Sequence, residues 1–429
     1  MNYRTTAADS VSGTLKIPGD KSISHRSLIF STLAEGRSYI KGMLESEDCI
    51  NTMKAFQSMG VEINKIEKGS YIVNGVGLRG LQEPDDIIYC GNSGTTMRLL
   101  TGLLSAQNFY TVLNGDHSLH KRPMDRVIIP LTSMGAKIWA RDNKFAPLSI
   151  KGQELNGINY KSPVASAQVK TSILLAGLYS NGDIVISEPG SSRDHTERML
   201  RSFGVDLVIN DHTIIMKKEN NLRLSAGEII VPGDISSAAF FIAAALITSN
   251  SELILENIGI NPTRSGFLTV VKEMGADIEI FNKRVSSGEP VADLKIRSSN
   301  LKGVTIGGDI IPTLIDEIPL LAVLSTQAEG RTVIKNAEEL RVKESDRIRT
   351  TCNGLRKMGV NVEELSDGMI IDGPVKLNGD IMIDSCYDHR IAMSFAIAGL
   401  VSDSPILVEN SEAINTSFPE FPSLMKEIM

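Results

Sequence analysis

One short arrangement recurs six times along this 429-residue chain: polar or charged residues open an apolar helix, which runs into a β-rich stretch. The six openings are Lys21-Ser22, Ser93-Gly94-Thr95, Ser166-Ala167-Gln168, Asp234-Ile235-Ser236-Ser237, Asp316-Glu317 and Asp388-His389-Arg390. The free N–H groups and the dipole at a helix N-terminus favour anions. If the repeats are related by symmetry, we expect several N-termini to converge on one anion site.

A second phrase occurs five times, at the end of another helix in each unit: SMGVEI, SMGAKI, SFGVDL, EMGADI and KMGVNV. Its glycines are Gly60, Gly135, Gly204, Gly275 and Gly359. A glycine there can take the left-handed conformation that closes a helix, and the alternating residues that follow predict a strand.

The spacing of the repeats predicts the domain organisation. A period of roughly 70–85 residues suits a βαβαββ-type unit. The sixth repeat ends early, and the chain begins with the strand-like SGTLKIPGD, so we expect N-terminal strands to complete the last unit. The matching phrases IPGDKS and VPGDIS mark the start of two halves.

We therefore predict an α/β fold of two similar lobes, residues 20–230 and residues 231–429 with 1–19. Each lobe would hold three such units, with buried parallel helices that point their N-termini at a cleft. A doubly wound α/β fold is the alternative. It is less favoured because the period is regular and no GxGxxG fingerprint occurs.

Composition narrows the class of partner. A net charge of −7 gives no reason to expect a nucleic acid or an acidic membrane, and 5% aromatics with one Trp argue against base stacking. The longest apolar stretch, 238–247, is too short to span a bilayer, and the N-terminus has no signal-like core. The four cysteines stand apart, and His117 and His120 lack a third ligand nearby. We expect a cytoplasmic protein without a metal.

Three segments of the first half suit a phosphate. Lys21–Arg26 (KSISHR) combines a helix start, hydroxyls and cations, although a solvated basic helix start has the same composition. Gly91–Thr96 (GNSGTT) opens a helix with Arg98 one turn in, and resembles a phosphate cradle without the Walker lysine; a plain capping turn is the alternative. Ser166-Ala167-Gln168 alone is only a helix cap.

Further cations follow in loops and at helix starts. Arg122 precedes Pro123, which makes its side chain project, and Arg193 lies in the loop SSRDHTER. Charges alternate along 341–347, where the simple interpretation is a surface helix with i, i+4 charge pairs and with Lys343 and Arg347 on one face. Arg390 opposes the dipole at a buried helix start, which favours an anionic ligand there.

Asp316-Glu317-Ile318-Pro319 places carboxylates at a buried helix start among these cations. Ordinary capping by Asp316 is one interpretation, and Pro319 fits the first turn. The functional interpretation is a general base for a substrate hydroxyl.

Taken together, KSISHR, GNSGTTMRLL, KRPM, ASAQVK, SRDHTE, IDEIP, RVKESDR, DHRIAMSF and TSFPEF resemble the signature segments of the 5-enolpyruvylshikimate-3-phosphate synthase family over the whole chain. The resemblance implies the two-lobe fold. It also implies transfer of the enolpyruvyl group of phosphoenolpyruvate to the 5-hydroxyl of shikimate 3-phosphate, with phosphate released through a tetrahedral intermediate, in the shikimate pathway to aromatic amino acids. A monomer without a cofactor is expected, and glyphosate is expected to compete with phosphoenolpyruvate.

The resemblance also assigns residues. Shikimate 3-phosphate would be held by Lys21, Ser22, Arg26, Ser166, Ala167, Gln168, Arg193, Asp316 and Lys343. Phosphoenolpyruvate would be held by Lys21, Gly94, Arg122, Gln168, Lys343, Arg347 and Arg390. The implied catalytic residues are Lys21, Asp316, which takes the hydroxyl proton, and Glu344, which protonates the methylene.

Three positions depart from the commonest family pattern and resemble a divergent branch. Thr416 stands where a lysine is often found, Ala167 replaces a serine, and Arg193 replaces a tyrosine. A related transferase acting on a UDP-aminosugar would need a reactive cysteine near KRPM, but none lies between Cys90 and Cys352. A non-catalytic sugar-phosphate binding protein is the other alternative, and acidic residues among the cations argue against it.

Overall fold

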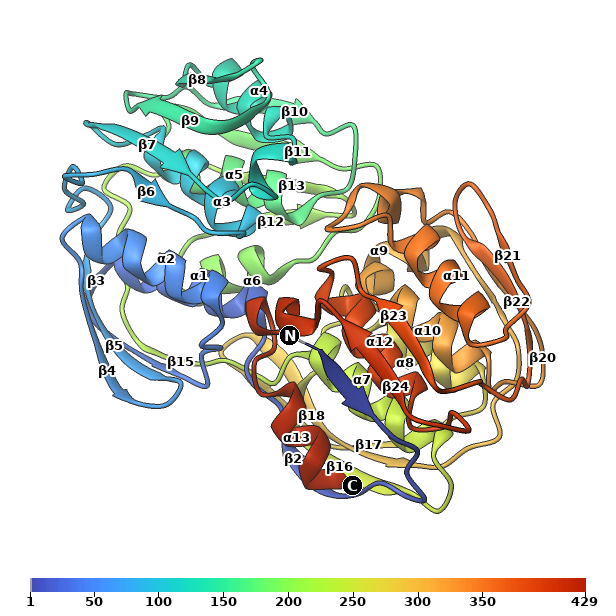
Figure 1. Cartoon of the computed structure of the whole chain (residues 1–429). Helices are drawn as coiled ribbons and strands as arrows, with labels where there is room; N and C mark the ends of the chain where they lie inside the picture. The colour runs from blue at the N-terminus through green and yellow to red at the C-terminus, as the bar shows by residue number, and fades with distance from the viewer. Residues whose placement is uncertain (1) are drawn as a thin grey trace. The chain divides into compact units, whose positions relative to one another are not determined.

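The computed structural model describes residues 2–429, which form two compact units (Figure 1). The first unit comprises Gly19–Val231 with the hairpin tip Ser286–Glu289, and the second comprises Met1–Pro18, Pro232–Val285 and Pro290–Met429. Each unit has its own hydrophobic core and three mixed sheets. The predicted α/β class with two lobes is confirmed.

The sheets of the first unit share one strand order. The first contains β14 (Leu224–Ser225), β3 (Ala34–Lys41), β5 (Ser70–Val76) and β4 (Glu62–Glu67), with β15 (Glu228–Ile230) also paired to β3. The second contains β6 (Ile88–Tyr89), β7 (Tyr110–Asn114), β9 (Phe145–Lys151) and β8 (Lys137–Arg141). The third contains β10 (Ile158–Lys161), β11 (Ile184–Ser187), β13 (Thr213–Met216) and β12 (Val208–Asn210). In each sheet a parallel pair is followed by two antiparallel pairings, the arrangement expected for a repeated unit.

Two kinds of helix accompany these sheets. The three that carry the repeated openings are α1 (Lys21–Leu33), α3 (Gly94–Leu104) and α5 (Ala167–Gly177). The other three are α2 (Glu47–Ser58), α4 (Asp125–Ser133) and α6 (His195–Ser202), with a short turn η1 (Leu119–Lys121). The side chains of α1 are buried from Ile23 to Leu33, whereas α2 and α4 bury only one face. The repeated openings therefore belong to the buried helices, as predicted.

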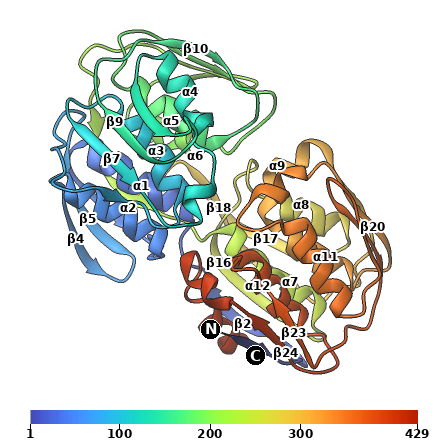
Figure 2. The ribbon, with the colours of Figure 1, turned by 45° about the horizontal axis from the view of Figure 1, so that its top comes forward.

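The second unit repeats the plan. Its sheets are β17 (Asp277–Ser286), β18 (Glu289–Arg297), β16 (Glu252–Gly259) and β2 (Ser12–Lys16); β19 (Thr305–Ile306), β20 (Gly330–Ile334), β22 (Met369–Gly373) and β21 (Val362–Glu364); and β1 (Tyr3–Thr5), β24 (Ile406–Glu409) and β23 (Ile381–Asp384). Its helices are α7 (Ile235–Ile247), α8 (Gly266–Glu273), α9 (Ile311–Leu314), α10 (Ile318–Ser325), α11 (Arg347–Lys357), α12 (His389–Ala398) and α13 (Phe421–Ile428). Short 3₁₀ turns are η2 (Gly308–Ile310), η3 (Ile315–Glu317), η4 (Glu338–Val342) and η5 (Ser411–Thr416). In Figure 2, α7 and α12 lie inside this unit and α11 lies outside them, beside β20.

The N-terminal strands are divided between two sheets of the second unit. β1 pairs with β24 in antiparallel register, Tyr3 opposite Val408, so it does complete the last sheet. β2 instead pairs in parallel with β16, Leu15 opposite Leu255, in the sheet of the fourth repeat. The prediction that both strands complete the last unit was therefore wrong for β2. Leu15 gains a fully buried place in the core by this pairing.

The repeated helix ends behave as the sequence predicts. Side chains of Asp20, Ser93, Ser166, Asp234 and Asp388 each accept a hydrogen bond from a backbone N–H in the first turn that follows. The five Met-Gly or Phe-Gly glycines all have positive φ, between +84° at Gly60 and +100° at Gly135. The fifth opening differs, because Asp316 and Glu317 lie in the 3₁₀ turn η3, and Glu317, the N-cap of α10, makes no side-chain cap hydrogen bond.

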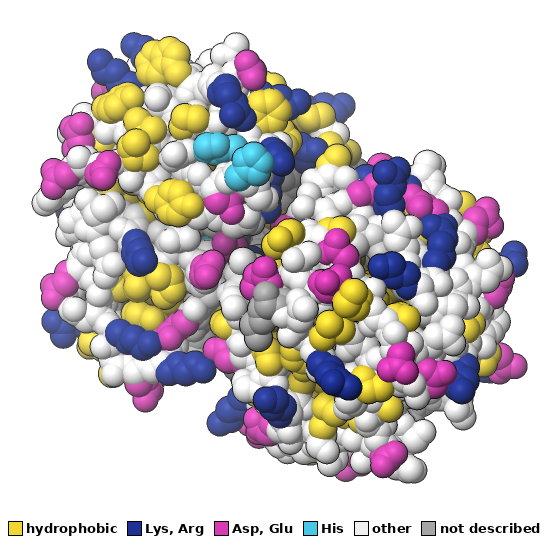
Figure 3. Space-filling model, viewed as in Figure 1, with side chains coloured by type: hydrophobic (Ala, Val, Ile, Leu, Met, Phe, Trp, Pro, Cys, Tyr) yellow, Lys and Arg dark blue, Asp and Glu magenta, His cyan; other side chains and the backbone are white. Residues whose placement is uncertain are grey.

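The surface carries charges of both signs. Figure 3 shows Lys and Arg side chains interspersed with Asp and Glu side chains on the face in view, without a large field of one sign. No helix within residues 2–429 is both long and apolar enough to cross a membrane. The four cysteines are unbridged; Cys49, Cys90 and Cys352 are buried, and Cys386 is exposed.

Candidate functional site

The start of α1 places two cations in different environments. Lys21 Nζ lies 2.7 Å from the Asp48 carboxylate and remains partly exposed. Arg26 is only 3% exposed, and its Nε and Nη2 donate to the hydroxyls of Thr196 and Thr171 at 2.7 and 2.8 Å. Burial lowers the pKa of Arg26 to about 10, so the guanidinium keeps its charge at neutral pH. A solvated basic helix start is therefore the wrong interpretation for Arg26, while Ser22 beside it is half-buried.

Arg122 is held by the loop that opens α3. Its Nη2 donates to Asn92 Oδ1 at 2.7 Å and its Nη1 to the Asn92 carbonyl at 3.3 Å. The Asn92 amide in turn donates to Asp116 at 2.7 Å. The loop is thus more than a capping turn, because it fixes the direction of a cation from another segment. A methyl group at Gly94 would lie 3.1 Å from Arg98 Nη1 and 3.7 Å from Arg122 Nη1.

The first turns of α3 and α5 are joined by side chains. Arg98 Nη1 donates to Gln168 Oε1 at 2.5 Å, and Gln168 Nε2 donates to Thr95 Oγ1 at 3.0 Å. Two guanidinium groups, from Arg98 and Arg122, therefore face the Gly94 backbone. The sequence offered one signal for Arg98, its place one turn after the loop, but it was not predicted to be a site residue.

Ser166 caps α5 and Ala167 is its first residue, half-buried. Arg193 lies in the loop between β11 and α6 and is also half-buried. Both segments contact Glu188, which the sequence did not single out: its carboxylate accepts from the Ser166 backbone N–H at 2.8 Å and from the Ser192 hydroxyl at 2.7 Å.

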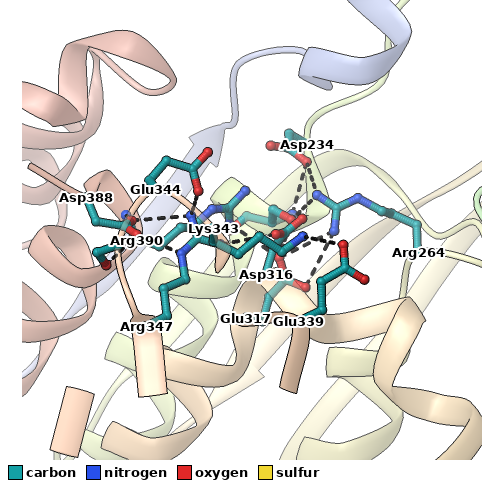
Figure 4. A network of polar contacts seen from close by, with 12 residues as sticks. Asp234, Arg264, Asp316, Glu317, Glu339, Lys343, Glu344, Arg347, Asp388 and Arg390 are labelled. Atoms are coloured by element: carbon teal, nitrogen blue, oxygen red, sulfur yellow. Dashed lines mark hydrogen bonds and ion pairs between the residues drawn. The ribbon is translucent and has the colours of Figure 1, made fainter. Parts of the chain in front are cut away.

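In the second unit, Arg347 lies among three carboxylates (Figure 4). Its nitrogens lie 3.3 Å from Asp316, 2.7 Å from Glu344 and 2.8 Å from Asp388. Burial alone would lower the pKa of Arg347, which is 2% exposed, but these carboxylates raise it above its ordinary value. The surface-helix interpretation is wrong, because α11 begins at Arg347 and Lys343 lies before it, at the end of η4.

Asp316 is partly exposed and ion-paired with Arg347. Its side chain is 18% exposed and its Oδ1 accepts from Arg347. The N-cap position of α10 is occupied by Glu317, which makes no side-chain cap hydrogen bond, and Asp316 lies one residue earlier, in η3. Asp316 and Glu344 thus contact the same guanidinium, and each keeps part of its carboxylate exposed.

Arg390 has a protein partner at its helix start. Its Nη1 lies 3.3 Å from Glu317 Oε1, and its guanidinium lies 5.9 Å from the centre of the Phe240 ring. Glu317 is 2% exposed and also pairs with Arg264 at 3.4 Å (Figure 4). Glu317 therefore supplies a negative charge beside Arg390 within the protein, and an anionic ligand at this helix start stays a prediction. Glu317 belongs to the fifth repeated opening, whereas Arg264 had no local signal in the sequence.

Two further positions from the sequence analysis, Lys343 and Thr416, also lie in the second unit. Lys343 Nζ is 3.8 Å from Glu339 and its side chain is 25% exposed. The hydroxyl of Thr416, which stands where a lysine is common, donates to the Ala413 carbonyl at 2.7 Å within η5. Among residues 2–429, no group of three or more His, Cys, Asp or Glu side chains is arranged to hold a metal ion.

The comparisons with known proteins identify the family of this chain. The family model for EPSP synthase (3-phosphoshikimate 1-carboxyvinyltransferase) matches residues 5–425. The chain belongs to the EPSP synthase family. It is 50% identical to the 3-phosphoshikimate 1-carboxyvinyltransferase of Petrotoga mobilis, with 100% of this chain and 99% of that one covered. It is 52% identical to the enzyme of the same name from Brevibacillus brevis, with 99% of each chain covered.

Solved structures show the same EPSP synthase fold. The EPSP synthase of Acinetobacter baumannii superposes with a TM-score of 0.91 at 46% identity, covering 100% of this chain and 98% of that one. The enolpyruvyl transferase NikO of Streptomyces tendae superposes with a TM-score of 0.81 at 14% identity, covering 99% and 96%, which shows a shared fold alone. The chain therefore has the predicted family and fold.

Proposed function

We propose that this chain transfers the enolpyruvyl group of phosphoenolpyruvate to the 5-hydroxyl of shikimate 3-phosphate and releases phosphate. The observation that carries the proposal is the pairing of Arg347 with both Asp316 and Glu344, because it brings an anion-binding group, a base and an acid together in a family of this activity. Residues 20–230 and residues 231–429 with 1–19 would be the two functional lobes.

Shikimate 3-phosphate needs groups for a phosphate dianion and for ring hydroxyls. We assign it to Lys21, Ser22, Arg26, Ser166, Ala167, Gln168, Arg193, Asp316 and Lys343. The N–H groups at the starts of α1 and α5 add to the charge of Arg26, whose hydrogen bonds to two threonines orient it without a neutralising contact at its nitrogens.

Phosphoenolpyruvate carries a carboxylate and a phosphate, which suit planar guanidinium groups. We assign it to Lys21, Gly94, Arg122, Gln168, Lys343, Arg347 and Arg390. Arg122 is pre-oriented by Asn92, and Gln168 is pre-oriented by Arg98 and Thr95. Groups that are already oriented lose little entropy when the ligand binds.

The reaction would proceed by addition and elimination. Asp316 takes the proton of the 5-hydroxyl as that oxygen bonds to C2 of phosphoenolpyruvate, and Glu344, in its protonated form, gives a proton to the methylene C3. In the second step Glu344 takes a proton back from the new methyl group. The C2–O bond to phosphate then breaks, and Lys21 stabilises the charge on the departing phosphate. This phosphate takes up the proton that Asp316 removed from the 5-hydroxyl, so Asp316 is again a carboxylate. Protons and charge balance over the two steps.

A phosphate-release assay tests this function. Release is expected only with both substrates present, and each substrate alone is the control. A non-catalytic sugar-phosphate binding protein would bind shikimate 3-phosphate, as measured by calorimetry, but would release no phosphate. Turnover with a UDP-aminosugar acceptor and none with shikimate 3-phosphate would favour the other transferase activity.

We also propose that the protein is a cytoplasmic monomer that needs no metal or organic cofactor. Light scattering on a sizing column is expected to give the mass of one chain, 46.6 kDa. Prolonged dialysis against EDTA is expected to leave the rate of phosphate release unchanged, and a rate restored only by added metal would contradict the proposal.

A further inference from the structure

Glu188 is a buried carboxylate that joins two segments of the first unit. The residue directly follows β11, and its side chain is 3% exposed. One oxygen accepts from the backbone N–H of Ser166, which caps α5, and the other accepts from the hydroxyl of Ser192. One side chain therefore ties the start of α5 to the loop that leads to α6.

The charge of Glu188 is balanced inside the protein. Lys170 Nζ lies 3.0 Å from Glu188 and 2.7 Å from Glu197, and all three side chains are 3% exposed. Burial alone would lower the pKa of Lys170, but Glu197 and Glu188 raise it above its ordinary value. A buried charge of this kind is tolerated only when it is paired and hydrogen-bonded. The proposed reaction uses none of these three groups.

The two segments that Glu188 joins carry residues assigned to shikimate 3-phosphate. Ser166, Ala167 and Gln168 lie at the start of α5, and Arg193 directly follows Ser192. The affinity of a site depends on how well its groups are fixed before the ligand arrives. A carboxylate that bonds both segments can therefore influence shikimate 3-phosphate binding without touching the ligand.

We propose that Glu188 is a positioning residue for shikimate 3-phosphate, which holds the α5 start and the Arg193 loop at the separation that the ligand requires. This inference rests on the proposed function. Glu188 acts through Ser166 and Ser192, so its influence falls on the binding of shikimate 3-phosphate and leaves the chemical step unchanged.

The matched pair Glu188→Gln and Glu197→Gln in the full-length chain tests the proposal. Each removes one of the two carboxylates that neutralise Lys170, but only the first alters the contacts to Ser166 and Ser192. By calorimetry without phosphoenolpyruvate, Glu188→Gln is expected to raise the Kd for shikimate 3-phosphate about 10-fold or more, and Glu197→Gln by less than about 3-fold.

Steady-state rates separate positioning from general damage. For Glu188→Gln, the KM for shikimate 3-phosphate is expected to rise, while kcat and the KM for phosphoenolpyruvate stay within about 3-fold of wild type. If this variant does not fold, Ser192→Ala, which removes one of the two bonds, is expected to raise the same Kd by a smaller factor.

Equal increases in Kd for the two glutamine variants, or an unchanged Kd in Glu188→Gln, would overturn the inference. So would an unchanged Kd in Ser192→Ala where Glu188→Gln does not fold. Wild-type protein that neither binds shikimate 3-phosphate nor releases phosphate would instead overturn the proposed function itself, so the two failures are distinguishable.

Discussion

Asp316 and Arg347 lie 31 residues apart in the chain and are ion-paired at 3.3 Å. The same guanidinium contacts Glu344 at 2.7 Å, so the proposed base and the proposed acid share one cation. Because the buried Asp388 also pairs with Arg347, we expect the guanidinium to stay in place when the proposed substrate anion binds. This arrangement makes the roles of the individual residues separable by substitution.

Replacing Asp316 by Asn is expected to lower kcat by about 10²–10⁴, the usual loss when a general base is removed. The amide has nearly the shape of the carboxylate, so the Kd for shikimate 3-phosphate is expected to change little. Stopped-assay rates and calorimetry measure the two quantities. A variant that turns over near the wild-type rate would show that Asp316 is not the base.

Replacing Arg347 by Met is expected to lower the free energy of unfolding by about 3–5 kcal/mol, because Asp388 is left buried without its charge partner. Chemical denaturation followed by circular dichroism measures this. The control is Arg331→Met, which breaks the exposed pair with Asp372 at 2.8 Å and is expected to change stability little. Similar losses in both variants would contradict a special role for burial.

Replacing Gly94 by Ala is expected to weaken the binding of glyphosate more than the binding of phosphoenolpyruvate. The added methyl group would lie 3.1 Å from Arg98 Nη1, so a guanidinium beside the ligand must move. Overpacking of this size costs about 1–3 kcal/mol, and the longer inhibitor has less freedom to adjust. Inhibition constants against phosphoenolpyruvate measure the effect.

The control for this substitution is Gly227→Ala, whose new Cβ would meet nothing within 4 Å. Equal inhibition constants for wild type and Gly94→Ala would remove Gly94 from the surface that contacts the inhibitor.

Stability is expected to fall as the pH drops below about 6.5, in part because of His25. His25 is fully buried, with Nδ1 2.7 Å from Thr52 Oγ1, and burial together with Lys21 and Arg26 lowers its pKa well below 6.5. Between the folded pKa and 6.5 the unfolded chain binds a proton that the folded chain does not. Stability is therefore full above pH 6.5 and declines below it.

The test compares melting temperatures of wild type and His25→Asn from pH 7.5 to pH 5. Asn can keep a hydrogen bond at the place of Nδ1 but does not titrate, so its curve is expected to be flatter in this window. Parallel curves for the two proteins would show that His25 does not contribute to the pH dependence.

The sequence by itself determined the features that depend on a few neighbouring residues. A capping side chain such as Ser93 and a helix-ending glycine such as Gly204 act within one turn, so their patterns predicted helix starts and ends correctly. The signature segments predicted the family for the same reason, because each keeps its residues in one short stretch. Even the division of the chain into repeats required only their spacing.

Only the tertiary structure decided which charged groups meet. Arg347 pairs with Asp388, Arg390 with Glu317 and Glu188 with Lys170, and the first two of these join different repeats. The pairing of β2 with β16 likewise joins strands that are far apart in the sequence, with Leu15 opposite Leu255. Such pairings depend on burial and on the register of the sheets. An ion pair between residues that are distant in the chain leaves no repeating pattern in the sequence, so the sequence does not predict it. The sequence therefore predicted which groups carry charge, and the folded core selected the partner of each.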